Sequence, residues 1–239
     1  MFGWRLKIGI LTPANNVVLE PEFYRHLPEG VAVYTTRMLT SGTHSLEGLV
    51  AMERNAKRGV EELAATAVDV IAYACLSTSL AKGLGWSESF IEDVRRATGL
   101  PATTAATATM DALRELGVKR VAIGTPFPDS ISVTVKPFFQ KYGFRVVAEK
   151  NLNVSDEKEI GRIAPDAIYG LGRDADVEEA QAVCLLATDI STLDVIEGLE
   201  SDLRKPVITT NQAILWKLLR LAGVQTCIPH VGRLLAERE

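Results

Sequence analysis

Short apolar runs alternate with longer amphipathic stretches along the chain. The first half carries RLKIGIL (residues 5–11), VAVYTTRML (31–39) and VDVIAYAC (68–75), and an amphipathic stretch from Leu46 to Thr66 precedes the last of these runs. Apolar runs of this length, separated by helical patterns, are typical of the buried parallel strands of βαβ units. The pattern therefore predicts an α/β fold built on parallel sheets.

The order of segments in the first half recurs in the second half. The matching stretches pair as IGILTPAN (8–15) with VAIGTPFP (121–128), VIAYACLS (70–77) with AVCLLATD (182–189), and LPATTAATATMDALRELGV (100–118) with KPVITTNQAILWKLLRLAGV (205–224). The spacing agrees as well, since 62 positions separate Pro13 from Cys75 and 61 separate Pro126 from Ala187. Ordered matches at near-equal spacing indicate an internal duplication, which predicts two pseudo-symmetric lobes.

Cys75 ends its apolar run and is followed by small hydroxylated residues in CLSTS (75–79). Ligands of open α/β sheets bind outside the carboxyl ends of the strands. Two lobes related by a duplication place these strand ends opposite each other, on the walls of one cleft. We therefore expect Cys75 and its counterpart Ala187 to face the same interlobe cleft. Cys184, which lies within the apolar run, is expected to be buried behind it.

The loops that follow the other strands offer mainly neutral polar groups, namely Asn15 and Asn16 in TPANN, Thr125 in GTPFPDS, and Thr188 beside Asp189 in LLATDIS. Helix capping is the alternative role for the asparagines and for the hydroxyl groups. A thiol beside neutral donors suits a small carboxylic acid, because the donors hold a carboxylate or an enediolate while the thiolate reaches carbon. We expect the N–H donors around Cys75 to raise its thiolate fraction above that of a free cysteine.

Composition excludes several classes of function. With a formal net charge of −4 and a pI of about 5.6, the chain has no electrostatic reason to bind nucleic acid or an anionic membrane surface. The first apolar run is too short for a signal peptide or for a membrane span of roughly 20 residues, so we expect a cytoplasmic protein. The three cysteines and three histidines lack metal-ligand spacing, and no Walker loop or G-x-G-x-x-G follows the first strand.

The repeat, the strand-end cysteine and TPANNVVLEPEF (12–23) resemble the aspartate/glutamate racemase superfamily, in particular maleate cis-trans isomerase and arylmalonate decarboxylase. The resemblance implies two flavodoxin-like lobes, each with a parallel four-stranded sheet, and an active site between them without metal or organic cofactor. We expect residues 1–104 and 212–239 to form the N-terminal lobe and residues 105–211 the C-terminal lobe. Formation of a homo-oligomer stays open.

The resemblance also assigns roles to single residues. Cys75 matches the first-lobe cysteine, which in the isomerases is the nucleophile that adds to the double bond, and Asn16 matches a substrate-binding asparagine. The chain departs from the pattern at three positions. Ala187 replaces the second-lobe cysteine, Phe127 replaces a tyrosine and Glu157 replaces an asparagine. The loss of one of two opposed acid/base groups argues against two-base racemisation, and Glu157 would repel a second substrate carboxylate.

These observations predict an enzyme that acts on a small carboxylic acid through the single cysteine Cys75. The leading expectation is cis-trans isomerisation of a maleate-like acid. The alternatives are an arylmalonate-type decarboxylase with its proton-donating cysteine on the opposite lobe, and a catalytically decayed small-acid-binding protein. The predicted substrate-binding residues are Asn16, Leu76, Ser77, Thr125, Phe127, Glu157, Ala187 and Thr188.

Overall fold

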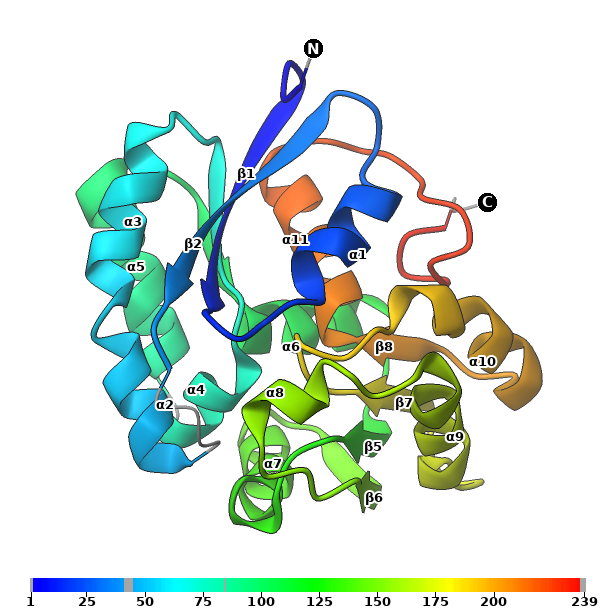
Figure 1. The fold of residues 1–239 in the computed structure, drawn as a ribbon. Coiled ribbons are helices and arrows are strands. Elements are labelled where there is room, and N and C mark those ends of the chain that lie inside the picture. The colour runs from blue at the N-terminus through cyan, green and yellow to red at the C-terminus, as the bar shows by residue number, and fades with distance from the viewer. Residues whose placement is uncertain (1, 41–44, 84, 237–239) are drawn as a thin grey trace.

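Two parallel four-stranded sheets form the framework of the protein (Figure 1). The computed structural model describes residues 2–40, 45–83 and 85–236. The strand order is β2-β1-β3-β4 in one sheet and β6-β5-β7-β8 in the other, so each lobe repeats the same topology. The expected α/β fold with two pseudo-symmetric lobes is thereby confirmed.

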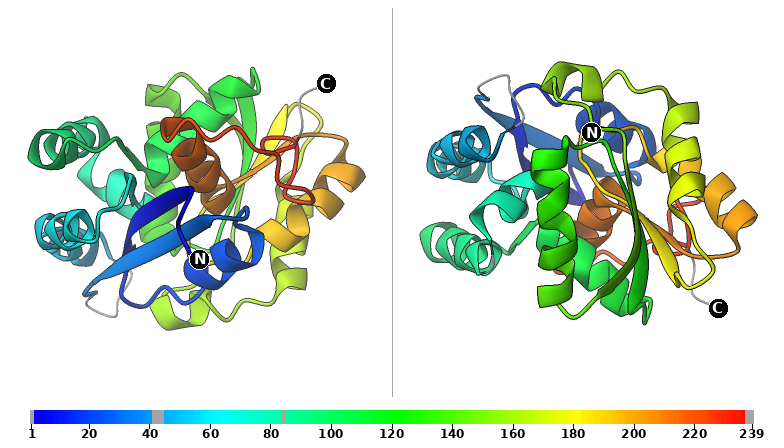
Figure 2. Two further views of the ribbon diagram at one scale, coloured as in Figure 1. Left: turned by 90° about the horizontal axis from the view of Figure 1, so that it is seen from above. Right: turned by 90° about the horizontal axis from the view of Figure 1, so that it is seen from below.

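The strands agree with the apolar runs of the sequence. They are β1 (Leu6–Pro13), β2 (Val31–Met38), β3 (Val70–Tyr73), β4 (Ala102–Thr104), β5 (Arg120–Thr125), β6 (Arg145–Asn151), β7 (Ala182–Leu185) and β8 (Val207–Thr209). The central strands β1, β3 and β7 are almost entirely buried, because helices cover both faces of a parallel sheet. Figure 2 shows the helices arranged around the two sheets.

The helices are α1 (Leu19–His26), α2 (Leu46–Glu53), α3 (Ala56–Ala65), α4 (Leu76–Lys82), α5 (Trp86–Thr98), α6 (Ala105–Glu115), α7 (Asp129–Lys141), α8 (Glu157–Ile160), α9 (Pro165–Ala175), α10 (Ile196–Leu203) and α11 (Thr210–Leu221). The amphipathic stretch from Leu46 to Thr66 is therefore two helices. At the break, the backbone N–H and the side-chain amide of Asn55 both donate to the carbonyl of Met52, at 3.0 and 3.1 Å. Such local bonding by asparagine competes with the helical pattern.

The duplication extends to the helix caps. Thr104 ends β4 and accepts a hydrogen bond from the Thr107 N–H at 3.1 Å, which starts α6. Thr209 ends β8 and accepts from the Gln212 N–H at 3.2 Å, which starts α11. Helix α11 then packs against α6 and against β3 and β4 of the first sheet. The residue boundaries between the lobes stay a prediction from the sequence.

A buried carboxylate joins the two halves of the chain. Glu22 of α1 accepts from the backbone N–H groups of Thr192 and Leu193, the latter at 2.7 Å, and from the side-chain amide of Asn211 at 2.7 Å. Burial raises the pKa of Glu22 from 4.5 to about 6, and its hydrogen bonds offset only part of that shift. Keeping Glu22 ionised in this contact therefore lowers the stability of the folded protein at higher pH.

We expect Glu22→Gln to flatten the pH dependence of stability. The folded protein holds the Glu22 proton more tightly than the unfolded chain, so stability is lost as the pH rises from about 4.5 to 6. The loss is roughly 2 kcal/mol. Urea unfolding of both proteins at pH 4.5 and pH 7 measures the difference. Equal changes in the two proteins would show that Glu22 does not titrate in this range.

No helix among the residues described above is long and apolar enough to cross a membrane.

Candidate active site

A small cavity lies between the lobes, at the carboxyl ends of the central strands. The lobes contribute the side chains that line it, which are Pro13, Asn15, Thr40, Leu49, Met52, Cys75, Leu76 and Ser77 from the first half, and Phe127, Glu157, Ala187, Thr188 and Asp189 from the second. Its open volume is about 20 Å³. This is room for about one water molecule, so a small acid enters only if the lining side chains shift.

Cys75 follows β3 and occupies the N-cap position of α4, with extended backbone angles of φ −148° and ψ 107°. Only 5% of its surface is exposed. Behind it, the hydroxyl of Tyr73 donates to Thr78 Oγ1 at 3.2 Å. The hydroxyl and the backbone N–H of Thr78 both form hydrogen bonds with the Cys75 sulfur. The strand end thus holds the thiol in a fixed position on the cavity wall.

The thiol of Cys75 is harder to ionise than a free cysteine. Burial raises its pKa from 9.0 to about 11. The hydroxyl and backbone N–H of Thr78 lower the pKa, whereas the negative charges of Asp189 and Glu157 raise it further. The sequence-based expectation of a raised thiolate fraction was therefore wrong, because desolvation of the charged sulfur outweighs the nearby donors.

The wall opposite Cys75 carries Ala187 where the first lobe has the thiol. Ala187 is 1% exposed and lines the same cavity, so the two duplicated strand ends do meet as the repeat predicted. Cys184 lies within β7 and is fully buried, and burial raises its pKa strongly. It is therefore an inert core residue, while Cys227 is partly exposed elsewhere.

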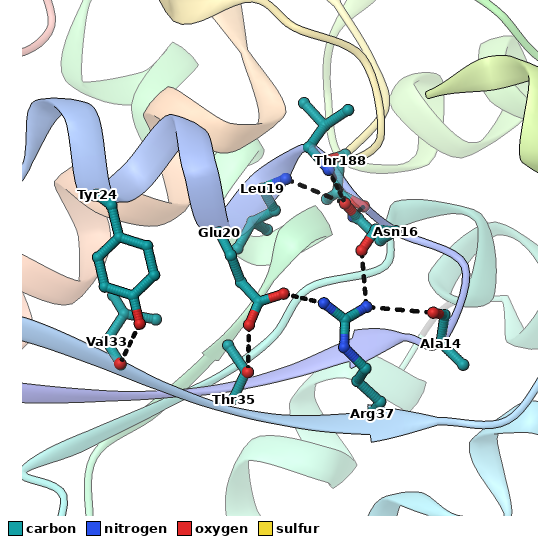
Figure 3. Close-up of polar contacts among 10 residues, drawn as sticks. Ala14, Asn16, Leu19, Glu20, Tyr24, Val33, Thr35, Arg37 and Thr188 are labelled. Carbon is teal, nitrogen blue, oxygen red and sulfur yellow. Dashed lines mark hydrogen bonds and ion pairs between the residues drawn. The ribbon is translucent and has the colours of Figure 1, made fainter. Parts of the chain in front are cut away.

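Asn15, rather than Asn16, lines the cavity. The Asn16 amide instead bonds across the lobes. Its Nδ2 donates to the carbonyl of Thr188 at 3.0 Å and to Thr188 Oγ1 at 3.2 Å (Figure 3). Its Oδ1 accepts from the N–H groups of Val18 and Leu19, both at 3.0 Å. Asn16 therefore binds the backbone at the start of α1 and ties this loop to the second lobe.

Arg37 fixes the same loop from the first lobe. Its guanidinium donates to the carbonyls of Ala14 at 3.1 Å and Asn16 at 2.8 Å, and it pairs with Glu20 (Figure 3). Asn15 is held at the cavity by a bond from Nδ2 to the carbonyl of Glu157 at 3.3 Å. Its Oδ1 is buried and has no hydrogen-bond partner within the described part of the chain.

Thr188 joins the two walls. Its hydroxyl donates to the carbonyl of Ala74, next to Cys75, at 3.2 Å. Its own carbonyl accepts from the amides of Asn16 and Asn211, at 3.0 and 3.1 Å. The network that begins at Glu22 thus ends at the backbone that carries the thiol.

The structure brings most of the predicted site residues together. Cys75, Leu76, Ser77, Phe127, Glu157, Ala187 and Thr188 all line the cavity. Thr125 does not, because it lies in a separate hollow near Ser132, 3.4 Å from that hydroxyl group.

Asp189 lines the cavity but was not among the predicted binding residues. Burial raises its pKa from 3.8 to about 7, and the charge of Glu157 adds to the shift. The signal available in the sequence was its place two positions after Ala187. Among the described lining residues there is no lysine or arginine, so acidic and neutral groups surround the thiol.

No group of three or more His, Cys, Asp or Glu side chains that could hold a metal ion occurs within residues 2–40, 45–83 and 85–236.

Comparison with known proteins agrees with the geometry. The sequence profile of the arylmalonate decarboxylase family matches residues 8–235. A maleate isomerase of Nocardia farcinica is 30% identical over 241 residues, which cover 97% of this chain and 96% of that protein. These matches span both lobes and the cavity between them.

Solved structures are similar over the whole chain. One is a Nocardia farcinica maleate cis-trans isomerase in which a cysteine is replaced by serine and a succinylcysteine is covalently bound. It is 29% identical, with a TM-score of 0.91 and coverage of 98% of this chain and 99% of that one. Another is a liganded arylmalonate decarboxylase in which a glycine is replaced by cysteine and a cysteine by serine. It is 25% identical, with a TM-score of 0.91 and coverage of 98% and 100%.

The two duplicated lobes, with a strand-end cysteine at the cavity between them, define a protein of the aspartate/glutamate racemase superfamily. Within it, the chain belongs to the arylmalonate decarboxylase family. Its full-length homologues include maleate isomerases as well as arylmalonate decarboxylase.

Proposed function

We propose that this protein is a cofactor-independent cis-trans isomerase of a small, maleate-like unsaturated carboxylic acid, with Cys75 as the nucleophile. The observation that carries the proposal is the place of Cys75, which is the one thiol among the described residues that line the cavity, where the second lobe contributes Ala187. The relative with a covalently bound succinylcysteine, in which another cysteine is replaced, supports covalent addition by a single thiol.

The reaction follows from reversible addition. The Cys75 sulfur forms a bond to one carbon of the double bond, the thiol proton passes to a base that later returns it, and the π electrons move toward the carboxylate on the other carbon to give an enediolate. The former double bond is now a single bond and rotates. The electrons then return, the carbon–sulfur bond breaks, and the trans acid leaves with the thiol restored. Neutral donors such as the Asn15 amide stabilise the enediolate.

The acidic lining favours a substrate with little negative charge. Glu157 and Asp189 both face the cavity, and no described lysine or arginine lines it. A second substrate carboxylate would lie close to one of these acids, where like charges raise each other's pKa. A singly charged acid, or one taken up in its protonated form, therefore fits better than the fully ionised maleate.

Proton NMR in deuterated water tests the function. Maleate, its half-amide and its half-ester are each incubated with the enzyme, and we expect the vinyl signals of at least one to convert to the trans isomer. Intact-mass spectrometry after acid quenching is expected to show an adduct on Cys75 and none in Cys75→Ser. Conversion at equal rates in both proteins would show that the thiol is not the nucleophile.

Decarboxylation is the second candidate. It is supported by the similarity to a liganded arylmalonate decarboxylase in which one cysteine has been introduced and another removed. In this case Cys75 would protonate the enediolate left after loss of carbon dioxide from a substituted malonate. Release of carbon dioxide from phenylmalonate, without isomerisation of any maleate derivative, would favour it. Saturable binding of these acids without turnover would instead favour a decayed small-acid-binding protein.

We also propose that the protein works in the cytoplasm and without a metal or organic cofactor. These proposals rest on the sequence patterns and on the family resemblance. Size-exclusion chromatography with light scattering distinguishes a monomer from the homo-oligomer that the sequence left open. Full activity after exhaustive dialysis against EDTA is the expected result for an enzyme that needs no metal.

A further inference from the structure

The cavity wall opposite Cys75 still holds an ionisable group, although position 187 has no thiol. Asp189 lies two residues after Ala187 on the same strand-end loop and lines the same cavity as Cys75. The two groups interact electrostatically, since the charge of Asp189 raises the pKa of the thiol. The loop is fixed by Thr188, whose hydroxyl donates to the carbonyl of Ala74 at 3.2 Å. Asp189 therefore lies on a loop of the second half of the chain that Thr188 ties to the backbone next to Cys75.

We propose that Asp189 is the acid/base group of this site, accepting the proton of the Cys75 thiol when sulfur attacks and returning it when sulfur leaves. The proposal deepens the isomerase function and rests on Cys75 as its nucleophile. In the addition step, the S–H bond breaks, its proton goes to the Asp189 carboxylate, and the sulfur electron pair forms the bond to carbon. In the elimination step, the carbon–sulfur bond breaks and sulfur takes the proton back.

The surroundings of Asp189 suit such a role. Burial and the neighbouring Glu157 raise its pKa to about 7, so that the carboxylate and the protonated acid are both well populated near neutral pH. A thiol whose pKa is about 11 is almost entirely protonated at that pH and needs a base to react. Glu157, Cys75 and Asp189 are the titratable groups lining the cavity within the described ranges.

Alkylation of Cys75 by iodoacetamide tests the proposal without any substrate. The sulfur–carbon bond forms, iodide leaves, and the thiol proton must go to a base. The rate is followed for the Cys75 peptide by mass spectrometry from pH 5.5 to 8.5. In the wild type we expect an inflection near pH 7, where Asp189 ionises. In Asp189→Asn we expect the inflection to vanish and the rate at pH 7.5 to fall by about tenfold or more.

If Asp189 acted on Cys75 only through its charge, Asp189→Asn would change the alkylation rate in the opposite direction. Because the negative charge of Asp189 raises the thiol pKa, its removal alone would speed alkylation. Glu157→Gln is the matched control, since it removes the other charge that raises this pKa, and we expect it to raise the rate. A rate in Asp189→Asn equal to or above that of the wild type, in a variant whose circular dichroism is unchanged, would overturn the proposal.

The assay also separates this proposal from the proposed function. If alkylation depends on Asp189 as described but no acid is isomerised in the NMR screen, the assignment of the base stands and the reaction assigned to the site is wrong. If an acid is isomerised but the Cys75 alkylation rate is unaffected by Asp189→Asn, the function stands and the base is another group.

Discussion

Cys75→Ser is expected to lower turnover of the isomerised acid by about two orders of magnitude or more, with little change in melting temperature. A serine hydroxyl has similar size but is a much weaker nucleophile and a weaker acid. The fold should tolerate it, because Cys75 occupies the N-cap of α4 in an extended conformation, and serine is among the residues most favoured at that position. Steady-state rates and thermal unfolding of both proteins measure the two effects.

The matched control is Cys227→Ser. Cys227 is partly exposed and lies far in sequence from the cavity residues, among which it is not found. We expect this variant to keep full turnover and to leave the rate of alkylation at Cys75 unchanged from the wild type. Full activity in Cys75→Ser would show that the thiol that follows β3 has a structural role only.

The fold could be predicted because its signals are local and repeated. Apolar runs such as 5–11 and 68–75 mark buried strands, and the duplicated ATTAATA and VITTNQA stretches mark a strand end with a capped helix after it. The meeting of Cys75 and Ala187 followed from the duplication alone. The break near Asn55 was not predicted, because one asparagine with local hydrogen bonds barely changes the amphipathic pattern.

The site was harder to predict because its properties depend on contacts between the lobes. Nothing in the sequence says which of Asn15 and Asn16 turns to the cavity, since the choice is made by the bonds of Asn16 to Thr188, 172 positions away. The pKa of Cys75 depends on how fully the lobes close over it, and burial reversed the expected direction. Thr125 ends its strand as expected, but its hydroxyl faces Ser132 in a separate hollow.

The Asp189 carboxylate at the cavity lowers the stability of the folded protein. Its neighbours in the cavity are the neutral Asn15 amide, the thiol and another acid, and no described lysine or arginine compensates its charge there. Burial therefore raises its pKa from 3.8 to about 7. A carboxylate kept in such surroundings is typical of functional sites, where groups are retained for chemistry rather than for packing.

Asp189→Asn is accordingly expected to stabilise the protein, and more so at high pH. Between pH 4 and 7 the folded state binds a proton that the unfolded chain releases, so the wild type loses stability as the pH rises through this range. Asparagine keeps the shape and does not titrate. The advantage of the variant should grow by roughly 3 kcal/mol between pH 5 and pH 8. Urea unfolding of both proteins at the two pH values measures it.

The exposed acid Asp174 on α9 provides the matched control, and Asp174→Asn should change stability by no more than about 0.5 kcal/mol at either pH. If Asp189→Asn is more stable than the wild type at pH 8 but its Cys75 is alkylated more slowly, the Asp189 carboxylate lowers the stability of the fold and raises the reactivity of the thiol. If Asp189→Asn is instead equally stable or less stable at pH 8, the carboxylate must be solvated or paired in solution. It would then have no raised pKa with which to exchange a proton with Cys75 near neutral pH.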